Sequence, residues 1–255
     1  MYSNIFDSHA HYDDSRFDED RDELLSSLKD KGVSFVVNCG CDLKTCLKTI
    51  DMAEKYSFVY AALGVHPHEA EDTTEEDFQK IKELCSREKV VAIGEIGLDY
   101  HYDFSPRDIQ KEMFEKQLIL ANELDLPVIV HDRESHEDTM NLLKKHKPKG
   151  VVHCFSGSVE MAKEIVKLGM YIGLGGAVTF KNAKKPVEVA EYIPLEYLLL
   201  ETDAPYMTPV PHRGERCHSG HIALTAEKIA GIKGMDTQEL INICEENAKR
   251  LFSIK

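Results

Sequence analysis

The chain has no uninterrupted apolar run of the length that a membrane-spanning helix needs, which is about 18 residues. Its first residues, MYSNIFDSHAHYDD, also lack the basic segment and the apolar stretch of a secretory signal. Both absences favour a cytoplasmic protein that has no membrane as a partner.

Positive charge is also in short supply. The sequence carries 31 Lys and Arg against 45 Asp and Glu, a formal net charge of −14. Because basic surface is the usual source of affinity for long nucleic acids, this balance argues against a broad duplex-binding groove. Any phosphodiester chemistry would have to act locally, with bound metal cations and a few well-placed basic groups.

Paired cysteine motifs are missing as well. The seven cysteines are scattered, Cys39-Gly-Cys41 is tighter than the usual CxxC spacing, and no second pair complements it. We interpret all seven as reduced thiols, with Cys39 and Cys154 packed as small hydrophobic side chains at strand ends. No linker or low-complexity tract divides the chain, so we expect a single domain over residues 1–255.

Eight short apolar runs recur along the chain, with amphipathic segments between them. The runs are mostly continuous, which is typical of parallel strands covered on both faces. Eight strand–helix units in this length predict an α/β fold, a (β/α)8 TIM barrel. The doubly wound alternative would place a Gly-rich turn after the first strand, where this chain has HAHYDD. The expected strands cover residues 5–9, 33–40, 58–65, 90–97, 127–131, 150–155, 170–176 and 195–203.

Two of the intervening helices have clear starts. The segment 106–125 has helical periodicity, with Ser105 expected as its N-cap and Pro106 as its first residue. Another helix is expected from Asp236, with Glu239 as its capping-box partner, and continues almost to the end of the chain.

Ionisable residues stand at the ends of five of the expected strands. In a barrel these ends form one ring on one face, where active sites lie. The segment DSHAHYDD (7–14) adds two histidines two positions apart, so both project from the same strand face. This set of nitrogen and oxygen donors is too large for one open tetrahedral site but suits two divalent ions sharing a bridging carboxylate. The predicted ligands are His9, His11, Glu95, His131, His153 and Asp203.

Several blocks of the sequence resemble the signatures of the TatD-type metal-dependent deoxyribonucleases, a family of amidohydrolase-like TIM-barrel hydrolases. The resemblance runs nearly from end to end. It departs at His101, where the family often has another aromatic residue, and at Cys217, where it often has asparagine. The matching blocks are DSHAHYDD, GVHPH (64–68), GEIGLDY (94–100), the segment 106–127, PVIVHDR (127–133), HCFSGS (153–158), ETDAPY (201–206) and RGER (213–216).

The resemblance implies a divalent-metal-dependent hydrolase that cleaves phosphodiester bonds of DNA through a metal-bridging hydroxide. Asp203 and Glu95 would be its catalytic carboxylates, with Asp203 orienting the hydroxide and taking its proton. Acidic walls favour exonucleolytic action on single-stranded ends. Two Mg²⁺ or Mn²⁺ ions would serve activity, while Zn²⁺ or Ni²⁺ would persist through purification. One ion would be held by His9, His11, Glu95 and Asp203, and the other by Glu95, His131 and His153.

Phosphate recognition needs hydrogen-bond donors, which are scarce in so acidic a chain. The long, proline-containing connection 204–221 carries several basic residues, and long ordered loops are more often functional than idle. For each arginine, a structural ion pair is as compatible with the sequence as a substrate contact. The predicted substrate-binding residues are Arg133, His66, His68, Arg213 and Arg216.

Two features near these residues leave alternatives open. Glu201 faces the same bowl-shaped ring of predicted metal ligands if its strand stays regular. It then either transfers a proton or orients a ligand histidine. Three aromatic residues follow Glu95 and either stack on bases or cover the mouth of the barrel: Tyr100, Tyr102 and Phe104.

Two other functions compete with a nuclease. An amidohydrolase, esterase or phosphotriesterase acting on a small molecule would be favoured by a carbamate-forming lysine at the end of the fourth or fifth strand. Glu95 and His131 occupy those places. A non-catalytic metal-binding or scaffold protein would have lost some ligands, and none is missing. We expect DNA as the partner and no stable protein partner, in a monomer or weak homo-oligomer.

Overall fold

The computed structural model describes residues 2–255, which contain one parallel sheet of eight strands in sequence order. Every neighbouring pair from the first strand to the eighth is parallel. The predicted (β/α)8 barrel is therefore confirmed. The strands are β1 Ile5–Ala10, β2 Val33–Cys39, β3 Val59–Leu63, β4 Val90–Asp99, β5 Val128–Arg133, β6 Gly150–Val152, β7 Tyr171–Leu174 and β8 Leu198–Leu200.

The barrel closes between β1 and the segment that follows β8. Ala10 forms a parallel bridge with Ala204. The backbone N–H of His11 donates to the carbonyl of Ala204 over 2.7 Å, and that of Asp203 donates to the carbonyl of His9 over 3.0 Å. The closure thus places the two N-terminal histidines beside Asp203.

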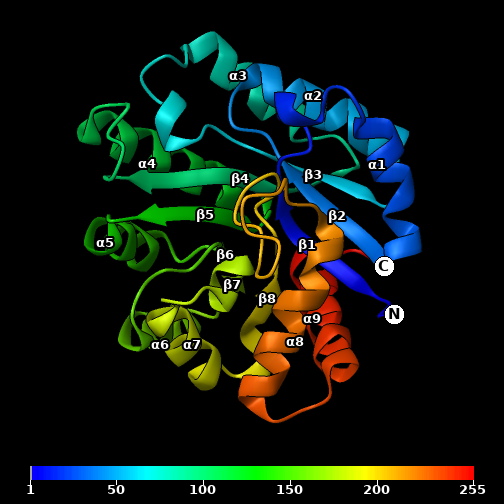
Figure 1. The fold of residues 1–255 in the computed structure, drawn as a ribbon. Coiled ribbons are helices and arrows are strands. Elements are labelled where there is room, and N and C mark those ends of the chain that lie inside the picture. The colour runs from blue at the N-terminus through cyan, green and yellow to red at the C-terminus, as the bar shows by residue number, and fades with distance from the viewer. Residues whose placement is uncertain (1) are drawn as a thin grey trace.

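Helices surround the sheet in Figure 1, and α9 lies beside β1. No helix within residues 2–255 combines the length and the apolar character needed to cross a bilayer. The helices are α1 Arg21–Ser27, α2 Leu43–Lys55, α3 Glu75–Leu84, α4 Arg107–Leu124, α5 His136–His146, α6 Val159–Lys167, α7 Lys184–Tyr192, α8 Ile222–Lys233 and α9 Thr237–Phe252.

The predicted start of α4 was wrong by one residue. The helix begins at Arg107, and the carbonyl of Pro106 accepts its first hydrogen bond. The Ser105 hydroxyl instead donates to the carbonyl of His68 over 3.0 Å and accepts from the N–H of Glu71 over 3.1 Å. The serine therefore ties the loop after β3 to the loop after β4, a use that local sequence cannot reveal.

The last strand is shorter than expected, whereas α9 begins as predicted. Leu195–Tyr197 forms a 3-10 turn, and the chain leaves the sheet after Leu200, so that Asp203 adopts a left-handed φ of 62°. At α9 the Asp236 carboxylate accepts a hydrogen bond from the N–H of Glu239 over 3.0 Å.

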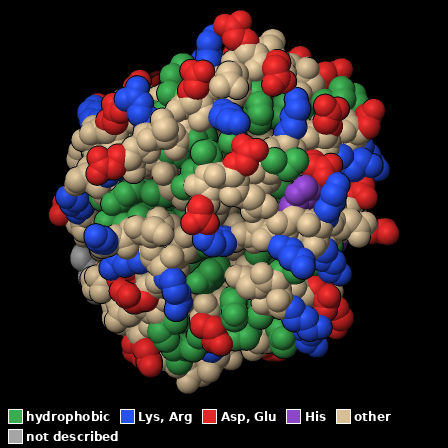
Figure 2. Space-filling model, turned by 180° about the vertical axis from the view of Figure 1, so that it is seen from behind, with side chains coloured by type: hydrophobic (Ala, Val, Ile, Leu, Met, Phe, Trp, Pro, Cys, Tyr) green, Lys and Arg blue, Asp and Glu red, His purple; other side chains and the backbone are tan. Residues whose placement is uncertain are grey.

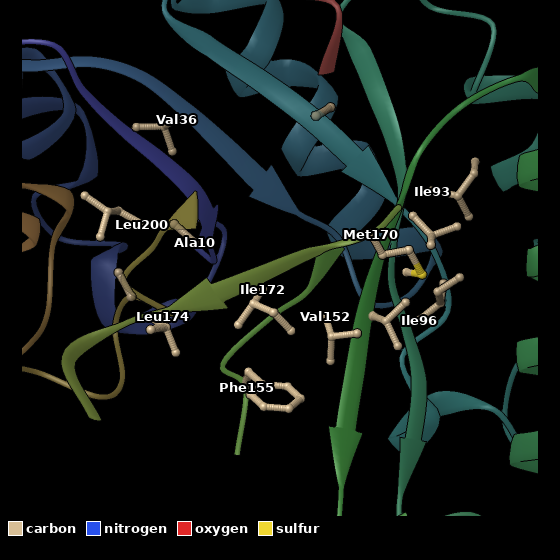
Figure 3. Packing of buried hydrophobic residues seen from close by; sticks show 14 of the residues in the cluster. Ala10, Val36, Ile93, Ile96, Val152, Phe155, Met170, Ile172, Leu174 and Leu200 are labelled. Carbon is tan, nitrogen blue, oxygen red and sulfur yellow. The ribbon is translucent and has the colours of Figure 1, made fainter. Parts of the chain in front are cut away.

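Two clusters of buried hydrophobic side chains hold the strand ends in place. The larger one fills the space around the sheet, and Figure 3 shows members such as Ile96, Val152 and Ile172 close together. Burial of each such side chain contributes about 1.5–3 kcal/mol. The smaller cluster joins one or two residues from every strand to Phe252 of α9. Because strand side chains alternate between faces, this second cluster marks the inner face of the barrel.

Candidate metal centre

The functional side chains form the next inward layer above that inner cluster. Since the strand period is two, a residue two positions beyond an inward hydrophobic side chain also points inward. The sequence thus builds a hydrophobic floor and a polar bowl from the same strands. The pairs are Ile129 and His131 on β5, Val151 and His153 at the end of β6, and Leu199 and Glu201 at the end of β8.

His9 and His11 converge on one point. Their Nε2 atoms lie 3.0 Å apart, and each is within 3.4 Å of Glu95 Oε2 and at 3.6 Å from Asp203 Oδ1. His11 Nδ1 lies 2.9 Å from the carbonyl of Cys39, which can only accept, so the ring hydrogen stands there and Nε2 keeps a lone pair. Two ring nitrogens and two carboxylates in this arrangement can hold a divalent cation.

A second group of donors meets the other oxygen of Glu95. His131 Nδ1 and His153 Nε2 each lie 2.7 Å from Glu95 Oε1, and these nitrogens are 3.4 Å apart. Glu95 is therefore placed between two histidine pairs, with one carboxylate oxygen toward each. This is the arrangement that a carboxylate bridging two metal ions requires.

The surroundings favour an ionised Glu95 and a neutral His9. At His131, by contrast, burial is outweighed by the hydrogen bonds to Asp99 and Glu95, which raise its pKa to about 9. Burial would raise the pKa of Glu95, but the surrounding histidines, foremost His153, His66 and His9, hold it well below its usual range. For His9 burial dominates and lowers the pKa, so this ring stays neutral. A neutral imidazole and an ionised carboxylate are the forms that bind metal.

His66 and His68 occupy different environments, although both were predicted to bind substrate. His66 is buried, with Nε2 3.6 Å from Glu95 Oε1, and its Nδ1 accepts from the N–H of His68 over 3.1 Å. Burial lowers the pKa of His66 to about 4. A neutral ring whose Nδ1 accepts must carry its hydrogen on Nε2. His66 therefore presents a donor to the bowl and no free lone pair there.

Asp99 is a buried residue of the site that the sequence analysis missed. Its Oδ2 lies 3.2 Å from His131 Nε2 and 2.8 Å from His68 Nε2, while Oδ1 accepts from the N–H groups of His101 and Tyr102. The segment GEIGLDY could have indicated Asp99, because an aspartate at the end of a fully buried strand needs hydrogen-bond or ion-pair partners. Asp99 fixes the His131 ring with Nδ1 toward Glu95.

Glu201 lies beneath His153, fully buried. Its Oε1 accepts from the N–H of Cys154 and stands 3.8 Å from His153 Nδ1, while Oε2 has no hydrogen-bond partner within residues 2–255. Burial raises the pKa of Glu201 to about 8. His153 Nδ1 likewise has no hydrogen-bond partner within residues 2–255, so Glu201 faces this ring without a hydrogen bond to it.

The three predicted arginines have different surroundings. Arg216 forms a two-pronged ion pair with Asp20, at 2.8 and 2.5 Å. The guanidinium of Arg213 lies 3.7 Å from the centre of the Phe180 ring. Arg133 is exposed and, like Arg213, enters no ion pair within residues 2–255. It differs from Arg213 in ending β5, two residues beyond His131, which places it nearer the metal ligands.

Aromatic side chains line one edge of the bowl. Tyr102 is 47% and Phe104 is 64% exposed, and their rings are stacked with centres 5.3 Å apart. The Arg133 guanidinium lies 4.8 Å from the Tyr102 ring, and the His68 ring lies 4.8 Å from that of Phe104. The pair therefore stands open beside the site, as a stacking surface requires.

All seven cysteines are free thiols, as predicted. Cys39 is buried with Sγ 3.3 Å from His9 Nδ1, on the side of the ring that faces away from Nε2. Cys154 is half-buried. Cys41, to which the sequence analysis gave no role, reaches the edge of the metal centre.

Comparisons with known proteins agree in family and fold. A family model described as TatD related DNase matches residues 6–253. An uncharacterized metal-dependent hydrolase of Bacillus subtilis, YabD, is 49% identical over 98% of this chain and 99% of its own. The 3'-5' ssDNA/RNA exonuclease TatD of Escherichia coli is 36% identical, with 98% and 99% covered. The crystal structure of the E. coli TatD homologue YJJV is 33% identical with a TM-score of 0.94, and all of both chains is covered.

Proposed function

Because this chain belongs to the TatD-related DNase family of metal-dependent hydrolases, we propose that it cleaves phosphodiester bonds at the ends of single-stranded DNA. The observation that carries the proposal is the position of Glu95, with one oxygen toward His9 and His11 and the other toward His131 and His153. A carboxylate with one oxygen toward each of two metal positions suits the two-metal hydrolysis of phosphate esters.

The donor chemistry fits two divalent ions. Imidazole nitrogens and carboxylate oxygens accept Mn²⁺, Zn²⁺ and Ni²⁺, and the carboxylates admit Mg²⁺. When bound, such ions polarise phosphoryl oxygens and lower the pKa of water. We assign Mg²⁺ or Mn²⁺ to activity and the tighter Zn²⁺ or Ni²⁺ to the protein as purified. The proposed ligands are His9, His11, Glu95 and Asp203 for one ion and Glu95, His131 and His153 for the other.

Asp203 is the proposed proton acceptor. Its side chain is 20% exposed at the bowl, and the hydrogen bond from its N–H to the carbonyl of His9 fixes the backbone there. Burial raises the pKa of Asp203. That direction applies to the metal-free protein; a cation held by His9 and His11 would favour the carboxylate, which is the form that can accept a proton from water.

His66 supplies a complementary group. Its Nε2–H points into the bowl beside Glu95 and can donate to a phosphoryl oxygen. This donor compensates for the scarcity of cationic side chains around the centre. His68 acts with Asp99 in holding His131, and so is a positioning residue in this proposal.

The edge formed by Tyr102, Phe104 and Arg133 suits a single strand. Stacking on aromatic faces tolerates any base and contributes about 1–3 kcal/mol per base. The formal net charge of −14 does not suit binding along a duplex backbone. Figure 2 shows acidic and basic side chains mixed over one face of the molecule. A relative at 36% identity is named as a 3'-5' ssDNA/RNA exonuclease, which supports a single-stranded nucleic acid as substrate.

The test is a metal-stripped protein given Mg²⁺, Mn²⁺ or Zn²⁺ in turn. Labelled single-stranded DNA, duplex DNA, RNA and a panel of esters and amides serve as substrates. We expect no activity without metal, and Mg²⁺- or Mn²⁺-dependent shortening of single strands that Glu95→Gln abolishes. Surface Glu196→Gln is the matched control. Turnover of small esters or amides without any shortening of DNA would contradict the proposal.

A further inference from the structure

Cys41 stands at the edge of the metal centre, just after β2. Its Sγ lies 3.9 Å from His11 Nδ1. More broadly, a ring nitrogen of His11, Cys41 Sγ and a Glu95 carboxylate oxygen all lie within 4.8 Å of one another. The thiol is free and half-buried. Because His11 Nδ1 donates to the carbonyl of Cys39, Nε2 is the nitrogen of this set that can bind a metal. The set therefore shares His11 Nε2 and Glu95 with the first predicted metal position and adds sulfur.

The backbone around Cys41 is fixed by local hydrogen bonds. The N–H of Cys41 donates to Thr45 Oγ1 over 2.9 Å, and the carbonyl of Cys41 accepts from the N–H of His66 over 2.9 Å. The next residue, Asp42, caps α2 through a reciprocal pair of bonds with Thr45. The thiol is therefore presented by a rigid turn.

Sulfur distinguishes among the cations that this site can receive. Thiolate is a soft ligand that binds Zn²⁺, Co²⁺ and Cd²⁺ well, whereas Mg²⁺ is a hard cation that takes oxygen ligands. The histidines and carboxylates serve both classes. Cys41 thus adds a donor that only one class can use.

We propose that Cys41 is a metal-selective ligand, which binds a thiophilic divalent cation through Sγ together with His11 and Glu95 and takes no part in binding Mg²⁺. The thiol releases its proton to solvent when the sulfur–metal bond forms. The inference deepens the proposed metal centre and is independent of the substrate. It also gives zinc a mode of binding that differs from that of the activating ions.

The test uses Co²⁺, whose bond to a thiolate produces sulfur-to-metal charge-transfer absorption in the near ultraviolet. We expect this absorption in the metal-stripped wild type titrated with Co²⁺, and its loss in Cys41→Ser. It should persist in Cys39→Ser, which removes the other thiol of the CGC segment, and in Cys85→Ser, which removes a buried thiol at the C-cap of α3. In parallel, Cys41→Ser should weaken Cd²⁺ binding by on the order of 10- to 100-fold and leave Mn²⁺ binding unchanged.

Absence of the absorption in the wild type, or its persistence in Cys41→Ser, would overturn the proposal. If Cys41→Ser does not fold, X-ray absorption of the zinc-loaded wild type gives the answer, because a sulfur ligand appears at about 2.3 Å from zinc. DNA hydrolysis with Mg²⁺ is assayed separately. If Cys41 does not bind metal but DNA is hydrolysed, only the sulfur ligand is contradicted. If Cys41 binds metal but DNA is not hydrolysed, only the proposed nuclease function is contradicted.

Discussion

Asp99 and His131 are joined by a hydrogen bond that decides which nitrogen of the histidine faces the metal centre. Asp99 Oδ2 lies 3.2 Å from His131 Nε2, and His131 Nδ1 lies 2.7 Å from Glu95 Oε1. An acceptor on Nε2 places the ring hydrogen there and leaves the Nδ1 lone pair for a metal. This relationship carries the first prediction.

Asp99→Asn should weaken metal binding at the His131 side. The amide removes the negative charge shared by His131 and His68, and the ring loses its fixed tautomer. We expect a loss of roughly 10- to 100-fold in Mn²⁺ affinity, measured by calorimetric titration. Exposed Asp103→Asn is the control, because Asp103 pairs with Arg107 at the surface. Unchanged Mn²⁺ affinity in Asp99→Asn would show that the hydrogen bond has no such role.

Glu201 predicts a pH dependence of stability in the metal-stripped protein. Burial raises its pKa from an ordinary value of 4.5 to about 8 in the folded state. The folded protein therefore keeps a proton that the unfolded chain has lost, so stability falls as pH rises through this window. Glu201→Gln stays neutral at every pH, and its free energy of unfolding should fall less between pH 5 and 8. Denaturant unfolding at several pH values checks this, and parallel slopes in the two proteins would contradict it.

Phe104→Ala should raise the KM for single-stranded oligonucleotides. Loss of one stacked base costs about 1–3 kcal/mol, which corresponds to roughly 5- to 150-fold in KM with kcat unchanged. Because Phe104 is mostly exposed, the melting temperature should change little. Ile119→Ala removes an exposed hydrophobic side chain from α4 and serves as the control. Equal KM values for the two variants would exclude a stacking surface at this edge.

Arg133→Ala should raise the KM on a dinucleotide substrate, because this guanidinium has no acidic partner within residues 2–255. Arg87→Ala, which removes an exposed arginine paired with Glu54, is the control. Arg216→Ala should instead lower stability, since its ion pair with Asp20 is part of the fold. Steady-state kinetics and thermal unfolding separate these outcomes. An unchanged KM in Arg133→Ala would remove this residue from the substrate site.

The sequence carried the architecture and the polar bowl because both follow from local periodicity. In a parallel barrel, histidines and carboxylates at the carboxyl ends of apolar strands meet on one face. The sequence alone therefore grouped His9, Glu95 and His153. Side-chain partners were harder to predict. Arg216 pairs with Asp20 and Ser105 bonds the loop after β3, and such contacts depend on how distant loops meet.

The two residues that the sequence analysis missed share one property. Asp99 lies inside GEIGLDY and Cys41 inside the CGC segment. The role of Asp99 and the role proposed for Cys41 each depend on a partner from another part of the barrel, which is His131 for Asp99 and His11 for Cys41. The spacing of residues along the chain does not reveal how close these side chains lie to their partners. Only the barrel closure and the register between strands fix them.

Anomalous scattering from a crystal soaked with Mn²⁺ tests the central claim most directly. The arrangement around Glu95 predicts two peaks, one near His9, His11 and Asp203 and the other near His131 and His153, with the Glu95 carboxylate between them. A map with no peak among these side chains, or with Glu95 turned away from both peaks, would contradict the account.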